Sequence, residues 1–433
     1  MTTVSPRRRR EIIDALRRGT VPQRGLDVMA VGLERFQVAL TDELDTVGGG
    51  GAVFKAVRGE YGAGKTFFAR WLTETAKQRG FATAEVQISE TETPLHRLET
   101  IYRRVTENLS TEATAPSAFR EVIDEWLRVL EEDVSSSGVD GSEIAQRTEA
   151  LLERRLAAVS RTAPAFAAAL RAYHAATVRG DTESADGLIA WLGGQPHVAS
   201  AIRRSAGIRG DLDHFGALGF MQGLLAVLRD ADYRGLVLVL DEVETLQRVR
   251  SDVREKSLNA LRQLLDEIDA GRFPGLYVLI TGTPAFFEGM QGVQRLPPLA
   301  ARISVDFSGD PRWDNPRAPQ LRLMGFQRDG LIELGKRVRD IYATGSDAAG
   351  RLNEQASDEY LSALADVVAG RLGGRVGIAP RVYLRKLVDI LDKIEQFPDY
   401  VPEEAGTVRV NAGELNDDER AAVRGLDAID LDV

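Results

Sequence analysis

Hydrophobic positions recur along the chain with two different periods, which predicts a mixture of strands and helices. Strands are predicted where short apolar runs rich in β-branched residues occur, at 53–57, 84–88, 236–240 and 276–280. Helices are predicted where apolar residues recur at helical spacing, at 6–20, 32–46, 67–79 and 253–270. The run 236–240 is apolar throughout, as expected for a parallel strand that is buried on both faces. Strands separated by helices predict an α/β fold with a doubly wound parallel sheet.

The remaining regions are mostly helical. From about 94 to 233 the pattern predicts a long helical insertion with loops near 135–141 and 193–196, and we find no repeat of fixed period in it. A short strand is predicted at 303–307, a proline-rich linker at 309–319, and helices at 329–342, 357–370 and 380–396. The expected organisation is an N-terminal helical segment, a core with its insertion, a helical C-terminal lid and an acidic tail, at 1–50, 51–310, 320–400 and 401–433.

Composition excludes several classes of protein. The 433 residues are 43% hydrophobic and 28% charged, which is ordinary for a soluble globular protein. Cysteine is absent, so disulfides, thiolate metal sites and cysteine nucleophiles are excluded. No apolar run reaches the length of a membrane span, and Arg7–Arg10 lead into an amphipathic helix, so we expect a cytoplasmic protein. The net charge of −10 argues against wrapping nucleic acid with the whole surface but leaves room for a local basic groove.

A glycine-rich loop follows the strand at 53–57 and leads directly into a helix. Its sequence, GEYGAGKTF, matches the P-loop or Walker A pattern, with residues Gly59, Glu60, Tyr61, Gly62, Ala63, Gly64, Lys65, Thr66 and Phe67. Glycines let successive backbone N–H groups turn toward phosphates, and the start of a helix adds its positive dipole end. We expect Lys65 to bind the β- and γ-phosphates of ATP and Thr66 to coordinate Mg²⁺. Glu60 should point to solvent, because an inward carboxylate would repel phosphate.

The strand at 236–240 ends in two acids, as in a Walker B motif. We expect Asp241 to hold Mg²⁺ and Glu242 to polarise the attacking water. Glu244 is two residues further along, and we expect it to have a structural and not a catalytic role. The strand at 276–280 is followed by Thr281, our first choice for a polar residue that positions the water, with Thr283 the second.

With this order of motifs the chain resembles an AAA+ ATPase. That resemblance implies an arginine finger at Arg302, within LAARI, which would reach the nucleotide of a neighbouring subunit; Arg295 is the alternative. It also implies a sensor 2 arginine at Arg381, within GIAPR, which would contact the nucleotide of its own subunit. A surface ion pair is the competing explanation for either arginine.

Several further segments resemble the BREX-system ATP-binding protein family of the BrxD type: GEYGAGKTFFARW, the WLGG that begins at Trp191, GLVLVLDEVETL, LITGTPAFFEG and APRVYLRKLVDIL. The resemblance implies a bacterial anti-phage defence setting, an AAA+ core related to origin-recognition and loader ATPases, and operation beside a large helicase. Many loader-type relatives carry a C-terminal winged helix, whereas the sequence after Gln396 is short and acidic.

Two functional hypotheses follow. The first is a homo-oligomeric, Mg²⁺-dependent ATPase that loads or remodels a DNA-processing partner. The second is a switch that hydrolyses ATP slowly and signals through its helical insertion. A phosphotransferase is a weaker third, because the insertion shows no clear cluster of basic residues for a small substrate. DNA contact is left open, with Arg7–Arg10, Arg203–Arg209 and Arg248–Arg254 as the candidate segments.

Overall fold

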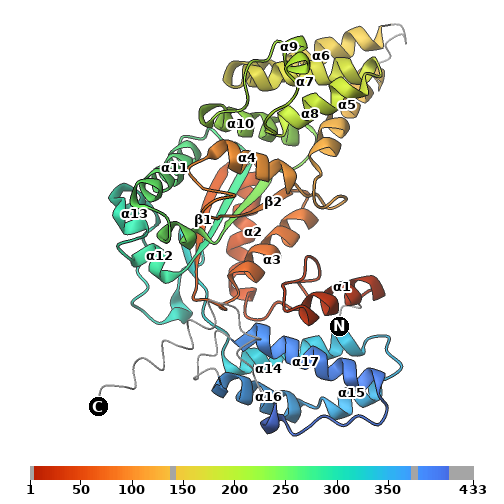
Figure 1. The fold of residues 1–433 in the computed structure, drawn as a ribbon, viewed down its shortest axis with the longest axis vertical. Coiled ribbons are helices and arrows are strands. Elements are labelled where there is room, and N and C mark those ends of the chain that lie inside the picture. Colours follow the sequence, from red (N-terminus) through yellow and green to blue (C-terminus); the bar gives the residue numbers. More distant parts are fainter. Residues whose placement is uncertain (1–3, 137–142, 372–378, 409–433) are drawn as a thin grey trace. The chain divides into compact units, whose positions relative to one another are not determined.

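The strands form a single sheet whose topology is that of an α/β protein. The computed structural model describes residues 4–136, 143–371 and 379–408. Within these ranges a five-stranded sheet has the order β2-β3-β4-β1-β5 (Figure 1). The strands are β1 Ala52–Arg58, β2 Ala82–Gln87, β3 Leu236–Asp241, β4 Leu276–Gly282 and β5 Gln320–Arg322. Strand β3 pairs in parallel with β2 and β4, so that Leu238 lies opposite Ala84 and Val278. The predicted α/β class is therefore confirmed.

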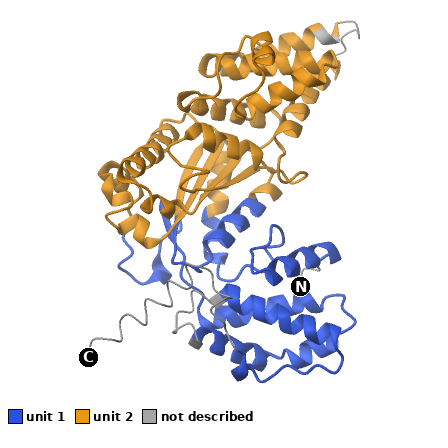
Figure 2. Ribbon diagram, in the orientation of Figure 1, with its two compact units in different colours: residues 1–39, 57–75, 306–433 blue, residues 40–56, 76–305 orange. Residues whose placement is uncertain are grey.

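The chain divides into two compact units, coloured separately in Figure 2. Unit 1 contains residues 1–39, 57–75 and 306–433, and unit 2 contains residues 40–56 and 76–305. Helices α2 (Glu34–Gly48) and α3 (Lys65–Gln78), like β1, run through a boundary. Each unit has its own hydrophobic core. The candidate phosphate loop belongs to unit 1 and the acid pair after β3 to unit 2.

Unit 2 combines most of the sheet with the predicted helical insertion. Every residue of β3 and β4 is buried, as expected for central strands of a parallel sheet. The helices between β2 and β3 are α4 Leu98–Glu107, α5 Phe119–Ser136, α6 Ile144–Thr162, α7 Pro164–Val178, α8 Thr182–Leu192, α9 Ser200–Ser205 and α10 His214–Asp230. Helix α10 packs against α4, α5, α6 and α7, and α4 packs against β2, so that the insertion and the sheet share one hydrophobic core. The expected loop at 193–196 is present, whereas that at 135–141 lies mostly outside the described residues.

After β3 come the 3-10 turn η1 (Val243–Gln247) and helix α11 (Ser251–Asp269). Beyond β4 the unit ends with α12 Pro284–Glu288, η2 Val293–Arg295 and α13 Pro297–Ile303. Within the described ranges, no helix combines the length and the apolar character needed to cross a bilayer.

Unit 1 buries a helical core that includes the N-terminal helix. Helix α1 (Pro6–Arg17) begins with Pro6 at its first turn, and the side chain of Ser5 accepts a hydrogen bond from the backbone N–H of Arg8. Its apolar side chains Ile12, Ile13 and Leu16 pack into the core formed by the C-terminal helices. These are α14 Arg328–Ala343, α15 Ala349–Gln355, α16 Asp358–Arg371 and α17 Ala379–Gln396. Among its described residues, unit 1 also contains the short turns η3 (Pro311–Trp313) and η5 (Ala405–Thr407).

One predicted strand is wrong. Residues 304–308 form no strand, and Ile303 is the last residue of α13. The edge strand is instead β5, where the backbone N–H of Leu323, the next residue, donates to the carbonyl oxygen of Arg58 over 2.8 Å. The ring of Phe307 packs under the guanidinium groups of Arg58 and Arg322, 4.9 and 5.0 Å from its centroid. Phe307 therefore packs against two arginines, whereas Ile303 is buried in the core of unit 2, and neither residue belongs to a strand.

Candidate ATP-binding site

The glycine-rich loop lies between β1 and α3, as the sequence predicted. Gly62 and Gly64 have φ angles of 77° and 91°, a region that side chains disfavour. A Cβ added at Gly59 would come within 3.1 Å of the Ala63 Cβ, so a larger residue there would require the loop to shift by a few tenths of an ångström. Glu60 is exposed, in the orientation expected for an acid beside a phosphate loop.

Lys65 places its ammonium group inside this loop. The residue is 8% exposed, and its Nζ donates to the carbonyl oxygen of Gly59 over 2.9 Å and to that of Glu60 over 3.4 Å. The ammonium also lies 5.1 Å from the centre of the Tyr61 ring. Because Lys65 is the first residue of α3, a buried cation and the N-terminal end of a helix occupy the same place. The loop therefore has the charge and the backbone geometry that fit a triphosphate.

A contact that the sequence did not reveal ties the N-terminal segment to the helix of this loop. The carboxylate of Glu74, in α3, accepts hydrogen bonds from the backbone N–H groups of Gly25 and Leu26, both over 2.7 Å. Arg70, one turn earlier, donates to the carbonyl oxygen of Val21 over 2.7 Å. These backbone contacts have no sequence signature, because they need only an acid and a base on one face of α3.

At the end of β3, Asp241 is buried and bonded to Thr281 of β4. Asp241 is 4% exposed and Thr281 is fully buried. The Thr281 hydroxyl donates to Oδ1 of Asp241 and accepts from the backbone N–H of Glu242 over 3.2 Å. Since a hydroxyl has one proton to donate, Thr281 in this arrangement orients the carboxylate of Asp241. Thr283, the second choice for positioning water, is also buried and precedes α12.

Glu242 differs from Asp241 in its backbone conformation. Its φ of 60° and ψ of 42° lie in the left-handed region, which is uncommon for a residue with a side chain. Its carboxylate Oε2 accepts a 2.9 Å hydrogen bond from the side-chain amide of Gln87, the last residue of β2. Strain of this kind is often found at functional sites, where the surrounding structure holds it. Gln87 is a site residue that sequence reasoning missed, since an amide at a strand end is not a motif.

The segment after Glu242 is held from α11 by Arg254. This guanidinium is 8% exposed and donates to the carbonyl oxygens of Leu246, Gln247 and Val249 over 2.8–2.9 Å. It also bonds the side chain of Gln291. Arg254 belongs to a stretch that we considered for DNA contact, but its donors are directed at the protein's own backbone. It fixes the turn that follows the acid pair.

The three candidate arginines have different surroundings. Arg302 forms ion pairs with Asp266 and Asp269 of α11, the second over 3.4 Å, and its side chain is 39% exposed. Arg295 is exposed and donates to the hydroxyl of Ser251 over 2.7 Å. Arg381 is in the first turn of α17 and lies next to Gly19, just beyond α1. Both finger candidates are thus on the surface.

Strand β1, the glycine-rich loop with its buried lysine, and helix α3 form the arrangement of a P-loop, and an acid pair follows the buried parallel strand β3. These features define an α/β P-loop protein. More specifically, the chain belongs to the BREX system ATP-binding protein BrxC/D family, whose family model matches residues 4–409. The resemblance noted from the sequence is confirmed at the level of the family.

Other comparisons add little. No curated protein matches the chain. Among solved structures, the ORC2 protein of Aeropyrum pernix, determined as ADPNP–ADP complexes, is similar at 12% identity with a TM-score of 0.34. The match covers 83% of this chain and 67% of that one. A similarity at this level carries no functional argument.

Proposed function

We propose that this protein binds ATP with Mg²⁺, hydrolyses it, and uses the turnover to load or remodel a DNA-processing partner, such as a helicase, in bacterial anti-phage defence. The observation that supports hydrolysis best is the acid pair after β3. Asp241 is buried and oriented by Thr281, whereas Glu242 is partly exposed and bonded to the amide of Gln87. Two adjacent carboxylates in different environments can take different roles, one as a metal ligand and one as a base.

The residues of the loop would bind the phosphates of ATP. Backbone N–H groups of residues 59–67 would face the phosphate oxygens, and the Lys65 ammonium would exchange the carbonyl oxygens of Gly59 and Glu60 for them. Thr66 and Asp241 would be the protein ligands of Mg²⁺. Within the described residues no group of three or more His, Cys, Asp or Glu side chains could hold a metal ion. Mg²⁺ bound through one carboxylate, a hydroxyl, water and phosphate oxygens is the arrangement usual in nucleotide sites.

Both motifs are proposed to serve one nucleotide. The presence of both a Walker A loop and a Walker B acid pair in one sequence supports this, because the first binds phosphates and the second supplies an acidic ligand for the metal. When bound, Mg²⁺ would neutralise charge that develops on the phosphates. Glu242 would take the proton of the attacking water, and we propose that its carboxylate turns away from the amide of Gln87 to do so. Thr281 would keep Asp241 in the orientation that binds the metal.

Further arginines are proposed to complete the site. Arg381 would contact the nucleotide of its own subunit. Arg302, or Arg295 in its place, would come from a neighbouring copy in a homo-oligomer, as the family resemblance implies. We place the protein in the cytoplasm, beside the other proteins of the BREX system.

The proposal is tested by ATP turnover per subunit over a range of protein concentrations. We expect the rate per subunit to rise with concentration, because a finger supplied by a neighbour acts only in an assembly. Glu242→Gln should retain ATP binding and lose turnover. Normal hydrolysis by Glu242→Gln would show that the base has been misassigned.

A second candidate function is a slow switch that signals through the helical insertion. The hydrogen bond from Gln87 to Glu242 favours it, because a base held by another group acts rarely. A wild-type rate that is very low and independent of protein concentration would support the switch over the assembly ATPase.

A further inference from the structure

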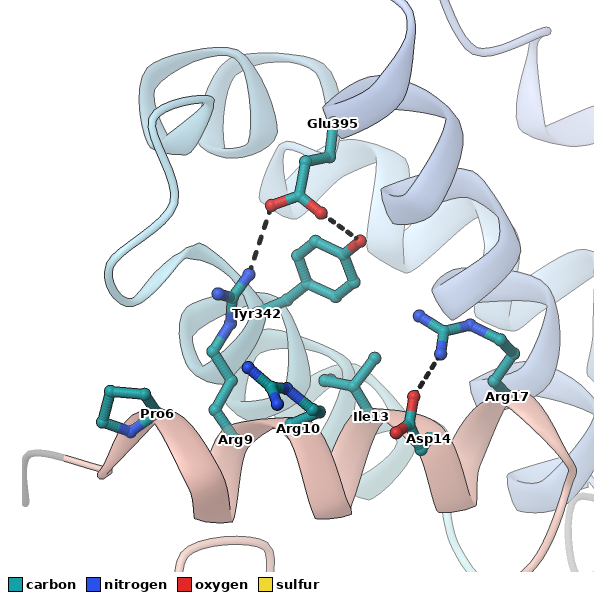
Figure 3. Close-up of a pocket in the computed structure, with 8 residues that line it drawn as sticks. All are labelled: Pro6, Arg9, Arg10, Ile13, Asp14, Arg17, Tyr342 and Glu395. Atoms are coloured by element: carbon teal, nitrogen blue, oxygen red, sulfur yellow. Dashed lines mark hydrogen bonds and ion pairs between the residues drawn. The ribbon is translucent and has the colours of Figure 1, made fainter.

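Helix α1 and the C-terminal helices line a basic pocket within unit 1. The pocket has a volume of about 200 Å³. Figure 3 shows Arg9, Arg10 and Arg17 from α1 on one side, with Tyr342 of α14 and Glu395 of α17 opposite. This space exceeds the roughly 30 Å³ share of one water molecule several-fold. It can therefore admit a group of several atoms.

Two of the three arginines are held in fixed positions. Arg9 bonds Oε1 of Glu395 over 3.3 Å, and its guanidinium lies 5.2 Å from the centre of the Tyr342 ring (Figure 3). Arg17 makes two bonds to the carboxylate of Asp392, of 2.7 and 2.8 Å. A guanidinium has five N–H donors, so an arginine that is paired with one carboxylate keeps donors for another anion. Because these side chains are already ordered, binding an anion would cost little further entropy.

Arg10 supplies charge that the pocket does not compensate. The two carboxylates of the lining are already paired, Asp14 with Arg17 and Glu395 with Arg9. Arg10 is exposed, and within residues 4–136, 143–371 and 379–408 its side chain has no hydrogen-bond or ion-pair partner. The lining therefore carries a net positive charge.

The basic surface continues beyond the pocket. Arg18 follows α1, and Arg385 of α17 lies next to Gly19; neither has an ion-pair partner in the described part of the chain. Of the six arginines in residues 6–18, four pair with acids, namely Arg7, Arg8, Arg9 and Arg17, so that Arg10 and Arg18 carry the uncompensated charge within the described residues. We call Arg9, Arg10, Arg17, Arg18 and Arg385 the α1 surface.

The spacing of these cations suits a repeating anion. Arg10 and Arg17 are seven residues apart on one helix, which corresponds to a rise of about 10 Å. A nucleic acid strand carries one charge per roughly 3.4 Å of helix axis, so it can meet several separated cations at once. The one aromatic ring in the lining, Tyr342, is already covered by Arg9 and is not free to stack on a base.

We infer that the α1 surface binds the phosphodiester backbone of nucleic acid without reading its bases. This extends the proposed function by naming a ligand class for a surface that has no part in ATP hydrolysis. Such contacts position a protein on nucleic acid and carry no sequence information.

The test measures binding of a fluorescein-labelled single-stranded oligodeoxynucleotide of mixed sequence to the full-length protein, by anisotropy, without nucleotide and over a range of salt concentrations. Removing one arginine that binds a phosphate of a single strand should reduce the slope of log K against log salt by about 0.7. We expect this reduction in Arg10→Gln and again when Arg385→Gln is added. Inorganic phosphate should compete only weakly, since it meets one cation cluster and not the whole surface.

Arg7→Gln is the matched control, because Arg7 is on the same helix, has an 82% exposed side chain, pairs with Glu11 and does not line the pocket. The inference would be overturned if Arg7→Gln and Arg10→Gln reduced the slope of log K against log salt equally, or if the wild-type protein did not bind the oligonucleotide. A third outcome is that inorganic phosphate competes strongly and that Arg10→Gln keeps the wild-type affinity for the oligonucleotide. This outcome would show a pocket for free phosphate and would also overturn the inference. ATP affinity is measured on the same proteins. Wild-type protein that binds ATP but not DNA refutes this inference alone, and protein that binds DNA but not ATP refutes the proposed function alone.

Discussion

The hydrogen bond between Gln87 and Glu242 gives a prediction with a definite size. If the base must leave this amide before it can take a proton from water, the cost of breaking the bond adds to the barrier of hydrolysis. The bond is 2.9 Å long and joins a neutral donor to a carboxylate on the surface. A bond to a charged group contributes about 1.5–3 kcal/mol net, and water competing at the surface reduces this to about 1 kcal/mol. Gln87→Ala should therefore raise the ATPase kcat about fivefold.

The assay is steady-state phosphate release at saturating ATP. Gln247→Ala is the matched control, because the Gln247 amide donates to the Ala285 carbonyl oxygen over 3.0 Å and has no hydrogen bond to Glu242. It should leave kcat unchanged. An unchanged kcat in Gln87→Ala would mean that the amide does not restrain the base. A lower kcat would mean that Gln87 positions Glu242 for catalysis, and either result refutes the reasoning.

Three further predictions concern the loop, the finger and the core. Lys65→Ala should weaken ATP binding at least tenfold in a calorimetric titration, because a buried cation that faces the phosphates is removed; unchanged affinity would contradict the loop assignment. Arg302→Ala should lower kcat with little change in ATP affinity. If Arg302→Ala hydrolyses ATP at the normal rate and Arg295→Ala at a reduced rate, Arg295 is the arginine finger. Glu43→Ala should reduce the free energy of unfolding in urea by about 3 kcal/mol, because Glu43 pairs with Lys55, which is 1% exposed, and accepts from the Tyr277 hydroxyl over 2.7 Å. If the free energy of unfolding falls by less than about 1 kcal/mol, other groups compensate the charge of Lys55 when Glu43 is removed.

The elements that the sequence predicted well are those with a strong local pattern. The apolar run after residue 235 could only be a buried strand or a buried helix, and its length, its β-branched residues and the following acids favoured a strand. The loop at Gly59–Thr66 combines several residue types at fixed spacing, and the structure places it between a strand and a helix. Helix α17 was predicted within one residue at its start because its apolar positions recur regularly.

The elements that it missed depend on contacts between residues far apart in the chain. Apolar and polar residues alternate over 303–307, as they do in a half-buried strand. In the structure, Phe307 instead packs under Arg58 and Arg322. Strand β5 is three residues long and is a strand because its backbone pairs beside β1, which local sequence does not encode. Gln87 reaches Glu242 across 155 residues of sequence, and no single-chain pattern predicts such a pair.

The arginine-rich segments show that contacts between distant residues also limit the prediction of function from sequence. The sequence offered Arg7–Arg10 as one candidate for phosphate contact. In the structure Arg7 pairs with Glu11, Arg8 with Asp27 and Arg9 with Glu395, which leaves Arg10 as the uncompensated member within the described residues. A run of like charges therefore overstates the number of cations available to a ligand, and the partners decide which remain.

The most direct test of the proposed site asks whether the loop around Lys65 and the carboxylate of Asp241 act on the same triphosphate. ATP is titrated calorimetrically into the wild-type protein and into Asp241→Asn, each with and without Mg²⁺. We expect Mg²⁺ to tighten ATP binding in the wild-type protein, and we expect Asp241→Asn to lose most of that tightening while keeping the affinity for ATP measured without Mg²⁺. The same Mg²⁺ effect in both proteins, or a wild-type protein that binds no ATP, would contradict the proposed site.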